Sequence, residues 1–214
     1  MNRFLCLLAL LSMSACTVQD ADVKLSNEYV FHDDYYYVFS SLSYTATKVH
    51  IIDSLDEYYF LFNSDFEEEV LESLYDHGFT KIIYIEDETF GVPSPEPLKN
   101  AKCAKVKGHG DIDQIPHVIF ASQLSINEYG ETCGYGNTLV VPIEPDNLQS
   151  YDAIMKHAEF LKVIPYSHPY QDPKKIYLAC TKESRGNPAE IANWFYEVAG
   201  YQADCLWGLG EWYQ

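Results

Sequence analysis

The chain has 214 residues, of which 14 are Lys or Arg and 32 are Asp or Glu, and its formal charge is −18 at pH 7. This length suffices for one or two domains, and 47% hydrophobic residues are enough for a buried core, which argues against a disordered chain. DNA, RNA and anionic lipid are bound through clustered Lys and Arg. The acidity therefore predicts no nucleic-acid partner.

The N-terminal residues 1–15 have the composition of a secretion signal. Arg3 precedes an apolar run at 4–11, which is too short for a bilayer core that needs about 20 residues. Residues 13–16 (Met-Ser-Ala-Cys) resemble the lipobox of bacterial lipoproteins, whose Cys is acylated. The resemblance implies that Cys16 carries a lipid and that a membrane is a partner through this anchor. Cleavage at an ordinary signal site with release is the alternative.

The residue after the cysteine bears on localisation. Thr17, rather than Asp, follows Cys16. In Gram-negative lipoproteins this pattern resembles the one sent to the outer membrane. We therefore expect a lipid-anchored protein of the cell envelope, at the outer membrane of a Gram-negative bacterium.

Residues 16–27 are polar and aperiodic and are predicted to be a tether. Residues 28–121 are predicted to form a smaller, β-rich α+β domain. A helix is expected to begin at Ser64, because Glu67 completes a capping box, and to end at Gly78. β-branched and aromatic runs predict the strands of this domain, at 29–31, 35–39, 49–52, 58–62, 81–85, 103–106 and 117–121.

Residues 122–137 are loop-like and mark the predicted boundary of a second domain, 122–206. A helix is expected after Asp146 and Asn147, and another from Asn187, which with Pro188 and Glu190 forms an N-cap signature, to the stop at Gly200. Strands are predicted at 138–143, 162–166, 174–180 and 201–206. The order β-α-β-β-α-β predicts a ferredoxin-like two-layer sandwich with strand order 4-1-3-2, so the fold class is α+β.

Four cysteines remain after the signal and Cys16 are set aside: Cys103, Cys133, Cys180 and Cys205. An even number outside the cytoplasm suggests disulfides, and Cys103 with Cys133 is the favoured pair. Cys180 and Cys205 fall on strands separated by a third, about 9.6 Å apart, whereas a disulfide tolerates about 7 Å. They pair only if strand ends converge, and are otherwise buried thiols. No close Cys/His cluster occurs, so no metal or cofactor is expected.

Three segments near the C-terminus together resemble a known family. They are 179–182 (ACTK), 186–197 (GNPAEIANWFYE) and 200–203 (GYQA). They are similar to the end of the N-terminal pro-region of secreted bacterial subtilisin-like serine proteases, and the resemblance covers about residues 120–206. The Tyr-rich residues 35–63 resemble the start of the same regions more weakly. The resemblance implies a ferredoxin-like domain that assists folding of a protease and blocks its active site with a C-terminal tail.

The catalytic motifs of that family are absent from the chain. Neither Asp-Ser/Thr-Gly, His-Gly-Thr nor Gly-Thr-Ser-x-Ala occurs, so nucleophile, base and oxyanion donors are missing. Cys205 stands where the family usually has Ala-Glu-Pro, which puts the exit path of the tail in question. The polar residues His109, Asp111, His117 and His168 form no known catalytic spacing. The chain is therefore predicted not to be an enzyme.

These observations predict a non-catalytic, lipid-anchored protein that binds, inhibits or chaperones a subtilisin-like protease. The tail 207–214 would enter the protease cleft as an extended strand, with anchors Trp207, Trp212, Tyr213 and Gln214. Alternatively, these aromatic residues fold back on the sheet. Two further hypotheses stay open: a glycan- or protein-binding surface that uses Tyr35, Tyr36 and Tyr37, and a remnant of a truncated protease.

Overall fold

A computed structural model describes residues 29–39, 45–87, 95–143, 148–167 and 172–205. Residues 31–214 cluster as one compact unit and residues 1–30 as another. The fold is mixed α+β, and every strand pair in the described ranges is antiparallel. The elements in chain order are β1 (Tyr35–Phe39), β2 (Ala46–Asn63), the 3-10 helix η1 (Ser64–Phe66), α1 (Glu67–Asp76), β3 (Phe79–Asp87), β4 (Ala101–Gly108), the 3-10 helix η2 (Ile112–Gln114), β5 (Val118–Asn127), β6 (Thr132–Cys133), β7 (Thr138–Pro142), α2 (Leu148–Leu161), β8 (Ile164–Tyr166), β9 (Lys175–Ala179), α3 (Pro188–Glu197) and β10 (Asp204–Cys205).

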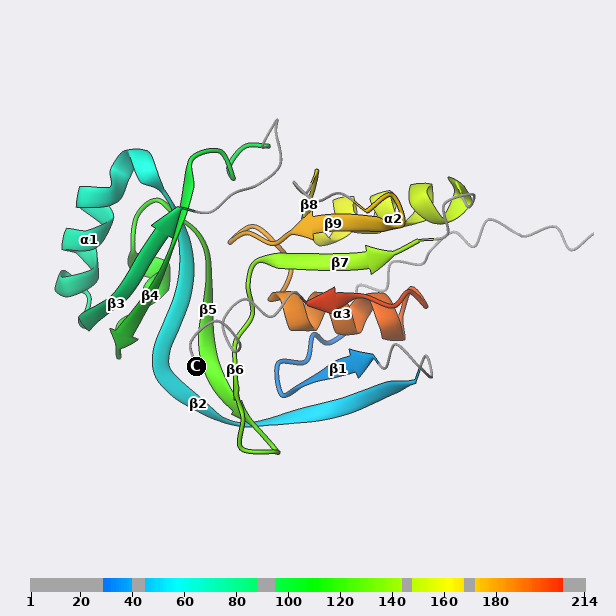
Figure 1. The fold of residues 1–214 in the computed structure, drawn as a ribbon, viewed down its shortest axis with the longest axis horizontal. Coiled ribbons are helices and arrows are strands. Elements are labelled where there is room, and N and C mark those ends of the chain that lie inside the picture. Colours follow the sequence, from blue (N-terminus) through cyan, green and yellow to red (C-terminus); the bar gives the residue numbers. More distant parts are fainter. Residues whose placement is uncertain (1–28, 40–44, 88–94, 144–147, 168–171, 206–214) are drawn as a thin grey trace, which may run out of the picture. The chain divides into compact units, whose positions relative to one another are not determined.

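The larger sheet has the order β3-β4-β2-β5-β6, and β1 pairs with β2 outside this path. The first residues of β2 pair with β1, and its last residues, from Glu57 to Asn63, pair with β4. The strands predicted at 49–52 and 58–62 are thus one strand of 18 residues. Register shifts against β5 between Ile51 and Tyr58 let the polar middle of β2 bend without ending the strand. Figure 1 shows this curvature of β2. The strand predicted at residues 29–31 does not form.

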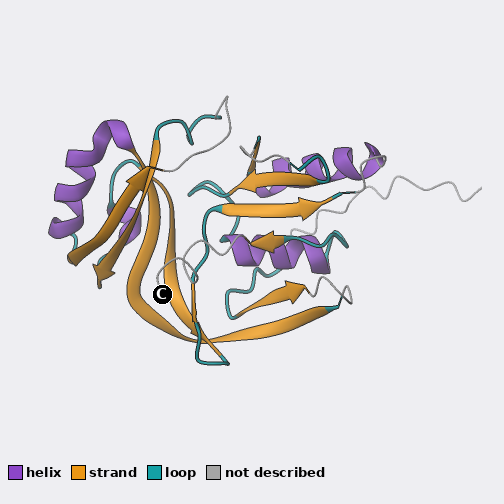
Figure 2. Cartoon of the chain, viewed as in Figure 1, coloured by secondary structure: helices purple, strands orange, loops and turns teal. Residues whose placement is uncertain are grey.

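Helix α1 lies against β2 and β3 (Figure 2). Val70 and Leu74 are fully buried on α1 and pack with Phe60 and Phe62 of β2. The capping box predicted at Ser64 does not form, because η1 occupies that position and the Asn63 side chain instead accepts a bond from the Asp65 amide. The cap position of α1, Phe66, provides no side-chain bond. Gly78, the predicted stop, has a φ of 93°.

Strand β5 extends into residues 122–127, whose polar composition predicts a loop. It continues to Asn127, and the predicted domain boundary after residue 121 falls inside it. The second half of this strand was not predicted because it contains polar residues, which are typical of loops. In the structure Ser122, Ser125 and Asn127 are nevertheless buried. Asn127 uses its amide fully: Nδ2 donates to Tyr36 and Glu131, and Oδ1 accepts from the backbone amides of residues 129 and 131. These bonds form the turn into β6.

The second sheet has four strands in the order β10-β7-β9-β8. Its elements follow one another as β-α-β-β-α-β, and α2 and α3 lie behind the sheet in the view of Figure 1. Leu139 pairs with Leu178 and Val141 with Ile176, which places these side chains on one face. They are buried together with the helix residues Ile154, Ala158, Leu161, Ile191, Trp194 and Phe195.

The start of α3 matches the sequence prediction in detail. The Asn187 side chain accepts from the Glu190 amide at 3.0 Å, and the Glu190 carboxylate accepts from the Asn187 amide at 2.6 Å. This reciprocal pair is a capping box with Pro188 in the first turn. Gly200, the predicted stop, has a φ of 74°. The cap predicted for α2 at residues 146 and 147 lies outside the described residues.

Removing this cap tests its contribution. Asn187→Ala is expected to lower the free energy of unfolding by about 1–2 kcal/mol, because the amide of Glu190 loses its acceptor. Asn187→Ser keeps a capping oxygen and is the matched control, which should recover most of that loss. Urea denaturation followed by circular dichroism measures both. Equal losses in the two variants would show that the bond to Glu190 is not what stabilises α3.

Candidate functional site

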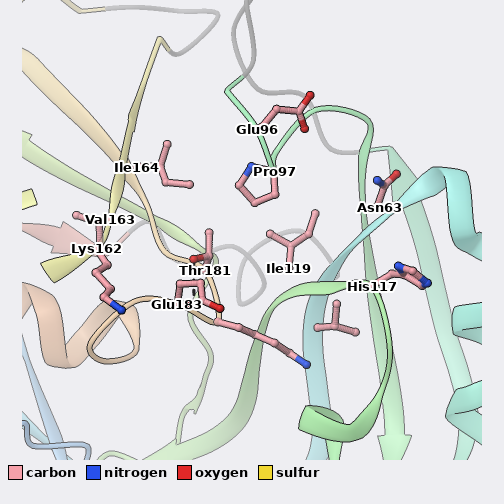
Figure 3. Close-up of a pocket in the computed structure, with 12 residues that line it drawn as sticks. Asn63, Glu96, Pro97, His117, Ile119, Lys162, Val163, Ile164, Thr181 and Glu183 are labelled. Atoms are coloured by element: carbon pink, nitrogen blue, oxygen red, sulfur yellow. Dashed lines mark hydrogen bonds between the residues drawn. The ribbon is translucent and has the colours of Figure 1, made fainter. Parts of the chain in front are cut away.

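The candidate site is a cleft of about 610 Å³ between the two sheets. This volume lies within the range of ligand sites in proteins, about 300–1,000 Å³. Figure 3 shows residues 162–164 on one side of the cleft and Asn63 with His117 on the other. Twelve residues line it: Asn63, Glu96, Pro97, His117, Val118, Ile119, Lys162, Val163, Ile164, Thr181, Lys182 and Glu183.

The sheet register explains why these segments meet. Ile164 pairs with Ala179, so the start of β8 and the end of β9 lie at the same end of the four-stranded sheet. The residues just outside those strands, at 162–163 and 181–183, therefore converge on the cleft. The Lys182 amide donates to the Ile119 carbonyl at 2.7 Å, which joins this wall to β5.

At two cleft residues the backbone adopts the left-handed conformation, which residues other than glycine rarely adopt. His117 has a φ of 58° and Lys162 a φ of 55°, and Asn100 is the third such non-glycine residue in the described ranges. This conformation costs about 1–3 kcal/mol per residue and is concentrated at functional sites. The cleft is therefore a place where the fold holds unfavourable local geometry.

His117 is held on the rim of the cleft by two contacts of its ring and one of its backbone carbonyl. Its ring stacks on Phe66, with centroids 3.7 Å apart and planes within 4°. Its Nε2 lies 3.3 Å from the Glu69 carboxylate. The backbone amide of Asn63 also donates to the backbone carbonyl of His117 at 3.2 Å. These contacts hold the left-handed backbone in place.

The rim carries both signs of charge over an apolar floor. Val118, Ile119 and Val163 are nearly buried and form the floor with Pro97 and Ile164. The Lys182 ammonium donates to the carbonyls of Ile112 and Asp113, each at 3.3 Å. Burial lowers the pKa of Lys182, and the charges of Asp113 and Asp111 oppose that effect. Lys162 is exposed on the same rim, together with Glu96 and Glu183.

The hydroxyl groups next to the cleft are hydrogen-bonded to backbone amides and carbonyls. Ser184 Oγ donates to the Lys162 carbonyl and accepts from the Thr181 amide, both at 2.9 Å. Thr181 Oγ1 accepts from the Glu183 amide at 3.2 Å. An apolar floor with a charged rim and hydroxyls engaged in the backbone suits binding of an amphipathic ligand rather than nucleophilic chemistry.

The polar residues considered as catalytic candidates have separate partners. His109 Nδ1 lies 3.1 Å from the exposed Asp56 carboxylate. Asp111 caps η2 by accepting from the Asp113 amide, while His117 contacts Glu69. His168 lies outside the described residues. In the described ranges, no three His, Cys, Asp or Glu residues are grouped so that they could hold a metal ion.

The four cysteines are all buried, and in the described residues none of them is joined to another by a disulfide. Cys103 lies on β4 and Cys133 on β6, with β2 and β5 between them. Three strand spacings come to about 14 Å, so the predicted bond between Cys103 and Cys133 does not fit this fold. β7 lies between β10 and β9, so Cys205 and Cys180 do not face each other on adjacent strands. Burial raises the pKa of the thiols of Cys133, Cys180 and Cys205, which makes them unreactive.

The tyrosine run packs inside the protein. Tyr35 and Tyr36 are each 4% exposed, so the run offers no row of three exposed rings. The hydroxyls of Tyr35 and Tyr37 donate to Glu197 of α3 at 2.8 and 2.9 Å, and buried Asn193 donates to the Tyr35 carbonyl at 2.9 Å. Burial, followed by the bond to Glu197, raises the pKa of Tyr37 to about 12. The run therefore joins β1 to α3.

The predicted lipidation residue Cys16 and the tail residues Trp207, Trp212, Tyr213 and Gln214 lie outside the described residues. No helix in the described ranges combines the length and apolar character needed to cross a membrane.

No protein-family model fits the chain, and a search of curated proteins finds no significant relative.

Proposed function

We propose that the protein is a non-catalytic inhibitor or chaperone of a subtilisin-like protease, held in the cell envelope by a lipid on Cys16. The observation that supports this proposal is the order β10-β7-β9-β8 in an antiparallel sheet built from β-α-β-β-α-β. Numbered within this sheet, the order reads 4-1-3-2, which is the order expected for the ferredoxin-like sandwich that the resemblance to protease pro-regions implies.

Residues 186–197, the longest segment of the resemblance to protease pro-regions, form and stabilise helix α3. Residues 186–197 supply the capping box and the buried face of α3, including Trp194 and Phe195 at 0% exposure. Buried side chains of this kind specify the fold. The inhibitory role therefore falls on the chain that leaves β10, where Trp207, Trp212 and Tyr213 would anchor an extended segment in the protease cleft.

Inhibition of a panel of subtilisin-like proteases by purified residues 22–214 tests the proposal. This span keeps the whole compact unit of residues 31–214. We expect slowly reversing inhibition with a constant below about 1 µM, a range that protein inhibitors of proteases reach readily. Deleting residues 207–214 should abolish inhibition, because the anchors are lost, while circular dichroism should show that the rest of the protein stays folded.

The matched control is Tyr129→Ala, which removes an aromatic side chain that is 64% exposed in the turn before β6. It should inhibit as well as the parent protein. Rapid digestion of residues 22–214, or no inhibition of any protease in the panel, would reject the protease link. Retained inhibition after the deletion would reject the tail mechanism alone.

A further inference from the structure

The direction of β10 relates the end of the described chain to the cleft. β10 runs antiparallel to β7, with Asp204 opposite Val140 and Cys205 opposite Leu139. The chain therefore leaves β10 toward the Thr138 end of β7. Thr138 pairs with Ala179, and Ala179 pairs with Ile164. This is the end of the sheet at which the residues after β9 and before β8 line the cleft.

The distance from Cys205 to the cleft is within reach of the tail. Three strand spacings separate β10 from β8, or about 14 Å. Residues 206–214 can span about 30 Å when extended. The tail thus needs about half its length to cross the sheet end and can place the other half in the cleft.

The chemistry of the tail complements that of the cleft. Five of the nine residues in Leu-Trp-Gly-Leu-Gly-Glu-Trp-Tyr-Gln are Leu, Trp or Tyr, a composition that favours burial. The floor formed by Val118, Ile119 and Val163 is apolar. Glu211 is the only charged side chain in the tail, and the exposed ammonium of Lys162 lies on the rim.

We propose that the cleft is the docking site of the chain's own residues 206–214. Trp207 or Trp212 occupies the apolar floor, and Glu211 lies near Lys162. The docked tail would connect β10, at one edge of the four-stranded sheet, with the cleft beside β8 at the other edge. If the proposed function also holds, the protease competes with the cleft for the same tail, and the free protein is partly self-masked.

Tryptophan quenching in residues 22–214 tests the docking without any protease. Trp194 is fully buried and provides a constant background, so acrylamide reports on Trp207 and Trp212. In the parent protein we expect little quenching. Ile164→Glu puts a charge on the cleft floor and should raise the quenching constant at least about twofold. Lys162→Glu changes a residue on the exposed rim, and should raise quenching by a smaller amount that falls with added salt.

Ile52→Glu is the matched control, because Ile52 is 63% exposed on β2 and does not line the cleft. Its tryptophan fluorescence should be quenched by acrylamide to the same extent as that of the parent protein. Circular dichroism should show that all variants keep the fold. Free quenching of the parent protein, or no change in either cleft variant, would overturn the docking. Protease inhibition is measured separately, so failure of this experiment leaves the proposed function standing, and failure of inhibition leaves the docking standing.

Discussion

Trp194→Ala is expected to lower the free energy of unfolding by about 3–5 kcal/mol, the range for removing a fully buried large aromatic side chain. Trp194 is 0% exposed on α3 and packs against His157 and Phe160 of α2, with ring centroids at 5.2 and 5.8 Å. The truncation leaves a cavity between the two helices that their backbones cannot fill. Chemical denaturation followed by circular dichroism measures the loss.

The same variant tests whether residues 31–205 unfold together. Asn193, next to Trp194, donates a buried bond to the Tyr35 carbonyl on β1, and β1 pairs with β2 of the larger sheet. We therefore expect the loss to appear in both sheets. Hydrogen exchange of protected amides in β4 and β9 should show the same drop in opening free energy.

Tyr151→Ala is the control for this prediction, because Tyr151 lies on α2 but is 43% exposed. It should change stability by no more than about 0.5 kcal/mol. If only β9 lost protection in Trp194→Ala while β4 kept its own, the chain would unfold in two steps, and the sequence-based division after residue 121 would describe its folding units.

The sequence predicts best where local signals agree with the tertiary contacts. In α3, the cap at Asn187, the proline after it and the inward positions Ile191 and Phe195 all indicate one helix, and the structure has it at Pro188–Glu197. β7 and β9 are short, apolar and bounded by turn residues, and they also lie within one or two residues of their predicted ends. These signals arise within a few residues of one another.

The missed features depend on contacts between distant segments. The middle of β2 and the second half of β5 are too polar to show strand alternation. They are kept extended by pairing with each other and with β4 and β6. The cleft unites residues from 63 to 183 through the register of β8 and β9 and the bond from Lys182 to Ile119. The left-handed backbone at His117 and Lys162 is a local feature of the cleft. It could not be predicted from the sequence, because His and Lys are found in every kind of backbone conformation.

His157 has the second large effect we expect, and it depends on pH. It is 3% exposed on α2, and within the described part of the chain its Nδ1 makes no hydrogen bond. The rings of Trp194, Phe195 and Tyr201 surround it, at 5.2 to 6.1 Å between centroids. Burial lowers the pKa of His157 below its ordinary value of 6.5.

A lowered pKa in the folded state sets the sign of the pH dependence. Between the lowered pKa and 6.5, the unfolded chain binds a proton that the folded chain does not. The stability linked to His157 is therefore complete above about pH 6.5 and is lost as the pH falls through that window. Glu190 and Asp204 oppose this trend in the whole protein, because burial raises their pKa and favours the folded state at lower pH.

The substitution His157→Leu isolates the histidine from those two acids. It removes a buried nitrogen without a partner and should raise the free energy of unfolding by about 1–3 kcal/mol at pH 5, with a smaller gain at pH 8. Urea denaturation at both pH values measures this, and His157→Met serves as a second apolar replacement. His109→Leu is the control, since its side chain is 83% exposed. An equal gain at pH 5 and pH 8 would mean that proton binding by His157 does not contribute, since the acids that remain are the same in both proteins.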